Sequence, residues 1–82
     1  MKVSEIVVGG TYTNGKGTER KVLAEGAEFK YYPSQEAGDC IQYTVTKRGP
    51  RVPHDDVGRK MNSTRASFAT WAKARVDAGG AA

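Results

Sequence analysis

The chain has 82 residues and a net charge of +4 at pH 7, a length that makes one domain with a small core. Its 27% charged and 38% hydrophobic residues are typical of a folded soluble domain and exclude a disordered chain. No apolar run approaches the ~20 residues of a membrane span, and the N-terminus lacks a secretory signal. Cys40 is the single cysteine, so an internal disulfide is excluded and we expect a reducing cytoplasm.

The first part of the chain predicts a β-hairpin. Residues 11–13, TYT, read as a short strand, and residues 18–25, TERKVLAE, read as its partner. Between them lies Asn14-Gly15, a pair that favours the positive φ angles of a tight hairpin turn. We expect Tyr12 to face the core.

A third strand is predicted over residues 28–32, EFKYY, where apolar and polar side chains alternate. Pro33 ends it, because proline cannot donate to a β-ladder. Residues 33–39, PSQEAGD, are rich in turn formers and predict a loop. We expect Phe29 to join Tyr12 in the core, with Tyr32 and Lys30 on the opposite face.

The cleanest strand signal covers residues 40–47, CIQYTVTK. Ile41, Tyr43 and Val45 fall on one face because successive strand side chains point to opposite sides. Short links join this segment to the preceding ones, which favours an antiparallel meander.

Residues 48–58, RGPRVPHDDVG, predict the longest irregular stretch, since two prolines and two glycines exclude a regular element. A connection of this length in a small domain is usually functional or mobile. Residues 59–62, RKMN, predict a short fifth strand.

Residues 63–76 predict the one helix, which Ser63 or Thr64 can cap. One helical face gathers four apolar side chains at the expected spacing: Phe68, Trp71, Ala72 and Val76. We expect a single domain over residues 1–76 and a disordered tail over residues 77–82.

These elements predict a mainly β fold, namely a small five-stranded antiparallel SH3-like barrel capped by a C-terminal α-helix. The nearest rival is an OB-fold. That fold would normally place its helix between strands three and four, where this chain has only the loop 33–39.

Neither a metal site nor an enzyme is predicted. His54, Asp55 and Asp56 are adjacent and cannot all converge on one ion, and no second histidine completes a zinc site. Cys40 as a nucleophile lacks a base, because the only histidine lies in a polar loop. The glycines near residue 15 do not match a phosphate-binding loop. We therefore expect no cofactor, no metal and no catalytic residues.

The positive charge is concentrated in the C-terminal part: residues 1–46 carry −1 and residues 47–82 carry +5. This asymmetry suggests an anionic partner, although ordinary solubilising charge explains it equally well. If the strands beside the long loop pair, its flanking cations converge and could contact phosphates without reading sequence. The candidate nucleic-acid contacts are Lys47, Arg48, Arg51, Arg59, Lys60 and Arg65, with Tyr32 as a stacking residue.

Three segments together resemble small, mostly uncharacterised proteins encoded by bacteriophages and prophages. They are VGGTYTNGKGTERKVL at the start, YPSQEAGDCIQYTV in the centre and STRASFATWAKARV at the end. The resemblance implies an SH3-like barrel and a phage accessory protein acting in the host cytoplasm. It carries no catalytic motif and implies no functional residues.

Two functions follow as hypotheses. The first is a non-enzymatic binding module for nucleic acid, with weak and non-specific contacts to phosphates. The second is a protein-interaction module that binds or inhibits a host protein, such as a defence or transcription factor. An enzyme is a distant third, because no acid/base pair or nucleophile has a partner.

Overall fold

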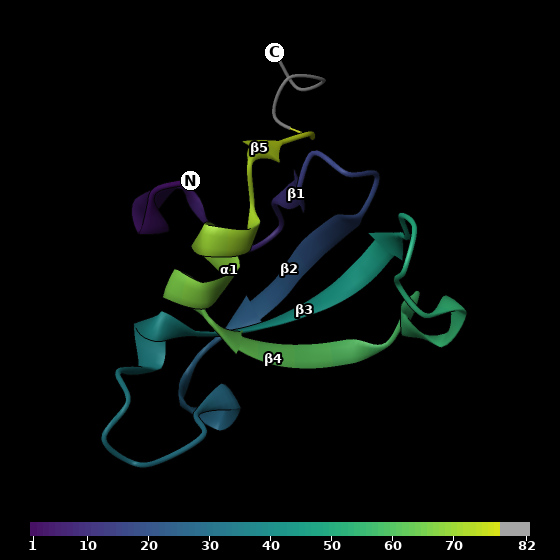
Figure 1. Ribbon diagram of the computed structural model, residues 1–82. Helices are drawn as coiled ribbons and strands as arrows, with labels where there is room; N and C mark the ends of the chain where they lie inside the picture. Colours follow the sequence, from purple (N-terminus) through teal and green to yellow (C-terminus); the bar gives the residue numbers. More distant parts are fainter. Residues whose placement is uncertain (78–82) are drawn as a thin grey trace.

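An antiparallel sheet of five strands organises the fold, in the order β4-β3-β2-β1-β5 (Figure 1). The computed structural model describes residues 1–77. Its strands are β1 (Thr11–Thr13), β2 (Glu19–Glu25), β3 (Cys40–Lys47), β4 (Lys60–Thr64) and β5 (Ala74–Arg75). The mainly β class with one helix is confirmed. The sheet stays open, with β4 and β5 as its two edges, so the predicted SH3-like barrel is not confirmed.

The central pair of the sheet is β2 and β3, whose register places Val22 opposite Tyr43. The register shifts between Glu19 and Arg20 and again between Val22 and Ala24. Ile41, Tyr43 and Val45 are all buried, which confirms the predicted alternation along β3.

The β1–β2 hairpin is confirmed. Thr11 pairs with Lys21 and Thr13 with Glu19. Gly15 adopts a φ of 78°, the left-handed conformation that the Asn-Gly pair predicts. The Asn14 side-chain oxygen accepts a hydrogen bond from the Lys16 amide at 2.8 Å, so an asparagine turn closes the loop.

The strand predicted over residues 28–32 is wrong. Ala27–Phe29 form a 3₁₀ turn, and the chain then loops back so that β2 and β3 pair directly. The Gln35 side-chain oxygen accepts hydrogen bonds from the Tyr31 and Tyr32 amides, which a strand would have paired with a neighbour. Phe29 is nevertheless buried, as predicted.

The predicted helix is shorter than expected. Helix α1 covers Arg65–Trp71, and the Thr64 side chain caps it by accepting from the Ser67 amide at 3.1 Å. The chain then extends into β5, because the free edge of β1 offers partners. The Lys73 amide donates to the Thr13 carbonyl at 2.8 Å, and the Val76 amide donates to the Thr11 carbonyl at 2.8 Å.

Because the helix ends early, only part of its predicted apolar face packs on the core. Phe68 and Ala72 are buried, as predicted, whereas Trp71, also predicted to be buried, is only half-buried. Val76 is 41% exposed and lies beyond the helix, so its predicted place on that face is wrong. Asp77, the first residue of the predicted tail, contacts Thr11, and residues 78–82 lie outside the described part of the chain.

The core fills the space between one face of the sheet and α1. Phe68 is at its centre. The Phe68 ring meets Tyr12 at 5.5 Å and Tyr43 at 5.4 Å between ring centroids, both edge to face. The predicted core positions of Tyr12 and Tyr43 are confirmed. No described helix has the length and apolar character of a membrane span.

Candidate nucleic-acid interface

The sheet brings most of the predicted cations to one end, where β3 finishes and β4 begins. The long loop folds back against this end, because the Gly58 amide donates to the Val45 carbonyl at 2.9 Å, and Lys60 pairs with Thr44. We call this the basic end of the sheet. Five exposed residues of the predicted set lie there: Lys47, Arg48, Arg51, Arg59 and Lys60.

Two further cations that the sequence analysis missed join the basic end. The hairpin turn that carries Lys16 packs on the long loop, since the buried Thr18 hydroxyl accepts a hydrogen bond from the Gly49 amide at 3.0 Å. Lys73 follows α1, and its Cγ lies 3.9 Å from where a Cβ on Gly15 would stand. The turn signal at residues 14–17 could have placed Lys16 there. Nothing in the sequence placed Lys73.

Few carboxylates oppose these cations. Glu19 pairs across the strands with Lys47, and Asp55 is exposed on the loop. Asp56 stands 3.9 Å from Arg59, the outer limit of an ion pair, and exposed pairs of this kind contribute little. The basic end therefore keeps a strong excess of positive charge.

A shallow hollow opens at the same end, with a volume of about 410 Å³. The hairpin turn and the long loop meet here, and the residues that line the hollow are Gly17, Lys47, Arg48, Gly49 and Pro50. Gly49 is needed for this meeting, because a Cβ there would stand 2.5 Å from the Lys16 carbonyl oxygen. Backbone and cations thus share one concave surface, which suits contact with a phosphate chain.

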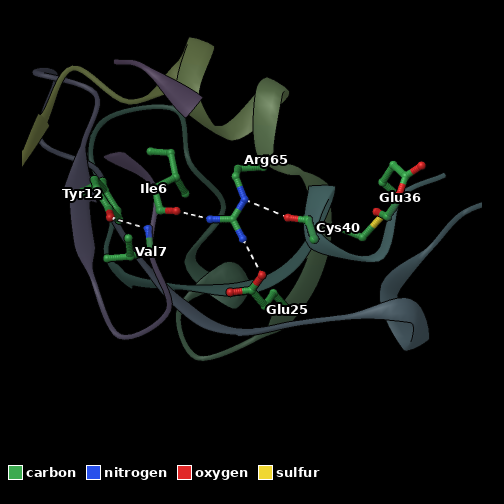
Figure 2. A network of polar contacts seen from close by, with 8 residues as sticks. Ile6, Val7, Tyr12, Glu25, Glu36, Cys40 and Arg65 are labelled. Atoms are coloured by element: carbon green, nitrogen blue, oxygen red, sulfur yellow. Dashed lines mark hydrogen bonds and ion pairs between the residues drawn. The ribbon is translucent and has the colours of Figure 1, made fainter. Parts of the chain in front are cut away.

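Arg65 does not belong to the basic end. It lies beyond the other end of β4, and its guanidinium is engaged by protein acceptors (Figure 2). Nε donates to the Gly38 carbonyl at 2.9 Å and Nη2 to the Glu25 carboxylate at 2.8 Å. Nη1 donates to the Ile6 carbonyl. With its side chain only 12% exposed, Arg65 ties the N-terminal segment, β2 and the 33–39 loop together.

Tyr32 is also far from the cations. It is 57% exposed and lines a hollow of about 530 Å³ at the opposite end of the sheet. Glu36 and Asp39 line the same hollow, and their charge disfavours a phosphate. The structure therefore separates Tyr32 from the phosphate contacts with which the sequence analysis grouped it.

Arg20 is a residue that the sequence analysis left unassigned. It lies on β2 opposite Val45, on the core face of the sheet. Its guanidinium carbon stands 4.1 Å from the ring centroid of Trp71 and 4.8 Å from that of Tyr43. Burial lowers the pKa of Arg20 from its usual value, and the nearby Tyr43 and Asp56 act in the opposite direction.

The remaining reactive side chains are structural or exposed. Cys40 is buried, and its thiol donates to the Glu36 carbonyl at 3.5 Å. Within residues 1–77, no group of three or more His, Cys, Asp or Glu side chains could hold a metal ion. No protein-family model, curated protein or solved structure matches this chain.

Proposed function

We propose that the protein is a small, non-enzymatic module that binds nucleic acid through the basic end of its sheet. The contacts are to the phosphate backbone, because the basic end carries no groove-reading helix and no exposed aromatic ring for a base to stack on. The resemblance of three sequence segments to phage proteins supports an accessory role in a host cell.

The observation that carries this proposal is the convergence of cations from three separate parts of the chain. The hairpin turn supplies Lys16, the long loop and its flanking strands supply five cations, and the segment after α1 supplies Lys73. Solubilising charge is usually dispersed over a surface. Gathering it at one end creates the local field that attracts a polyanion.

Arg51 adds a second argument. Its φ is 72°, a value that is unfavourable for residues with a side chain and favourable for glycine. Nothing in its backbone position requires arginine. The residue is exposed, so an arginine here offers its charge to solvent at a conformational cost.

The test compares two charge-matched double variants in titrations against short duplex and single-stranded DNA and RNA. Arg48→Ala with Arg51→Gly removes two cations of the basic end without touching the core. Lys2→Ala with Lys30→Ala removes two cations elsewhere. We expect wild-type affinity in the micromolar range or weaker at physiological salt. The variant at Arg48 and Arg51 should bind more weakly, and its slope of log K against log salt should be smaller by about 2. The variant at Lys2 and Lys30 should change affinity and slope little.

An absence of binding to every nucleic acid at low salt would contradict the proposal. So would equal losses in the two double variants, since then only net charge would matter. The second candidate, a protein-interaction module, would remain. It is favoured by the hollow at the opposite end, where Val3 and Tyr32 expose apolar surface.

A further inference from the structure

Neither the core nor the basic end accounts for the position of the Arg20 guanidinium. It lies between the rings of Tyr43 and Trp71, both of which also pack on Phe68 at 5.4 Å between ring centroids. Two aromatic faces hold the planar group in a fixed position. This contact stabilises the cation, but it provides no acceptor for its N–H groups.

Two other arginines of the described chain, one shielded and one exposed, are each paired with a carboxylate. Arg65 contacts Glu25 at 2.8 Å, and Arg75 contacts Asp77 at 2.9 Å. Arg20 has no ion pair within residues 1–77, and its Nε is buried without a hydrogen-bond partner. Most buried polar atoms are satisfied, so an unsatisfied guanidinium nitrogen requires an explanation.

One carboxylate acts on Arg20 from a distance. Asp56 affects the pKa of Arg20 by its charge, but it is not within ion-pair distance of that residue and lies 3.9 Å from Arg59 instead. The guanidinium of Arg20 is therefore fixed by the two rings, and no carboxylate within ion-pair distance in residues 1–77 neutralises its charge. Arg20 is partly exposed, so an external anion can reach the part of its side chain that faces solvent.

Arg20 also lies at the correct end of the sheet. Its strand neighbour Glu19 pairs with Lys47, the last residue of β3 and part of the basic end. The opposite residue Val45 bridges to Val57 in the long loop. The guanidinium thus lies just inside the basic end, on the side of the sheet that α1 covers.

We propose that Arg20 is an oxyanion-binding residue whose guanidinium fork takes one phosphate group of the bound nucleic acid. This inference rests on the proposed function and names a contact within it. Arginine suits this role because its planar donors match two oxygens of a phosphate at once. The aromatic pair fixes the fork in advance, so little rotational freedom is lost on binding.

Trp71 supplies a direct readout, because it is the only tryptophan in the chain and its ring contacts the guanidinium. We would titrate the protein with sodium pyrophosphate, and with sodium chloride at matched ionic strength, while recording tryptophan fluorescence. Pyrophosphate should give a saturable change and chloride should not. A short single-stranded oligonucleotide, titrated in the same way, should give a change of the same sign.

The variants separate this contact from general charge. Arg20→Met keeps an apolar stem over the rings and removes the cation, and Lys30→Met removes one cation at the opposite end. Arg20→Met should weaken oligonucleotide binding at least tenfold, as expected for loss of a charge-assisted hydrogen bond. It should also abolish the pyrophosphate response, while Lys30→Met should change affinity less than threefold. Melting followed by circular dichroism checks that both variants fold.

Asp56→Asn provides a second variant in case Arg20→Met does not fold. It removes the competing negative charge near Arg20, so pyrophosphate should bind more tightly by threefold or more. Unchanged oligonucleotide affinity in Arg20→Met, or unchanged pyrophosphate affinity in Asp56→Asn, would overturn the inference and leave the basic end as the proposed interface. A saturable pyrophosphate response without oligonucleotide binding would support the anion site and contradict the proposed function instead.

Discussion

Asp77 is the residue that fixes the last described strand. Its carboxylate accepts a hydrogen bond from the Arg75 side chain at 2.9 Å and another from the Thr11 amide at 2.9 Å. These bonds lower the pKa of Asp77 to about 2, and the bond from Arg75 has the larger effect. One side chain thereby joins β5 to β1 at the free edge of the sheet.

The lowered pKa makes the contribution of Asp77 dependent on pH. It is fully present above the ordinary pKa of about 3.8 and is lost as the pH falls towards about 2. We expect Asp77→Asn to melt at a lower temperature than the wild type at pH 7, and the gap to close between pH 4 and pH 2. Thermal melts of the wild type and Asp77→Asn at pH 7, and at several values between pH 4 and pH 2, test this expectation. A gap that persists unchanged at pH 2 would contradict an ionic role.

Helix α1 is held to the sheet chiefly by Phe68. This side chain is 1% exposed and contacts Tyr12 and Tyr43, so Phe68→Ala should reduce the free energy of unfolding by about 3–5 kcal/mol. Trp71 is only half-buried, and Trp71→Ala should be less damaging. Urea unfolding followed by circular dichroism at pH 7 measures both. Equal losses would mean that Trp71 is as central to packing as Phe68.

The elements that could be predicted are those whose signal is local. The alternation in 40–47 and the turn pair at Asn14-Gly15 act within a few residues, and both were correct. The strand expected over 28–32 failed because the Gln35 side chain takes its amides. The helix expected to reach residue 76 failed because β1 had an unpaired edge. In both cases the deciding interaction is made with a side chain or with a distant strand, and the periodicity of apolar residues carries no information about such partners.

The candidate site divides in the same way. Cations close in sequence to the long loop do converge, because two adjoining strands fix the ends of that loop. Arg65 could not be assigned from sequence, since its partners Ile6 and Glu25 lie far away along the chain. Arg20 could not either, because its environment is made by aromatic rings from β3 and α1.

At the scale of the whole molecule, the charges separate along the sheet. The basic end combines seven exposed cations with Arg20, while the opposite end carries four carboxylates, Glu25, Glu28, Glu36 and Asp39, beside Lys30 and Arg65. A polyanion would be drawn to one end and repelled from the other. If the partner is a polyanion, as proposed, this separation would orient the molecule before contact and speed association at low salt.

The linear strand order has a consequence for how the molecule opens. β2 and β3 each have neighbours on both sides, whereas β5 has two residues and pairs only with β1. Local opening starts where a few backbone hydrogen bonds hold an exposed edge. In hydrogen–deuterium exchange, the amides of Val22 and Tyr43 should therefore exchange last, and those of Lys73 and Val76 should exchange first among the sheet amides. Equal protection of β5 and β3 would mean that the sheet opens only as a unit.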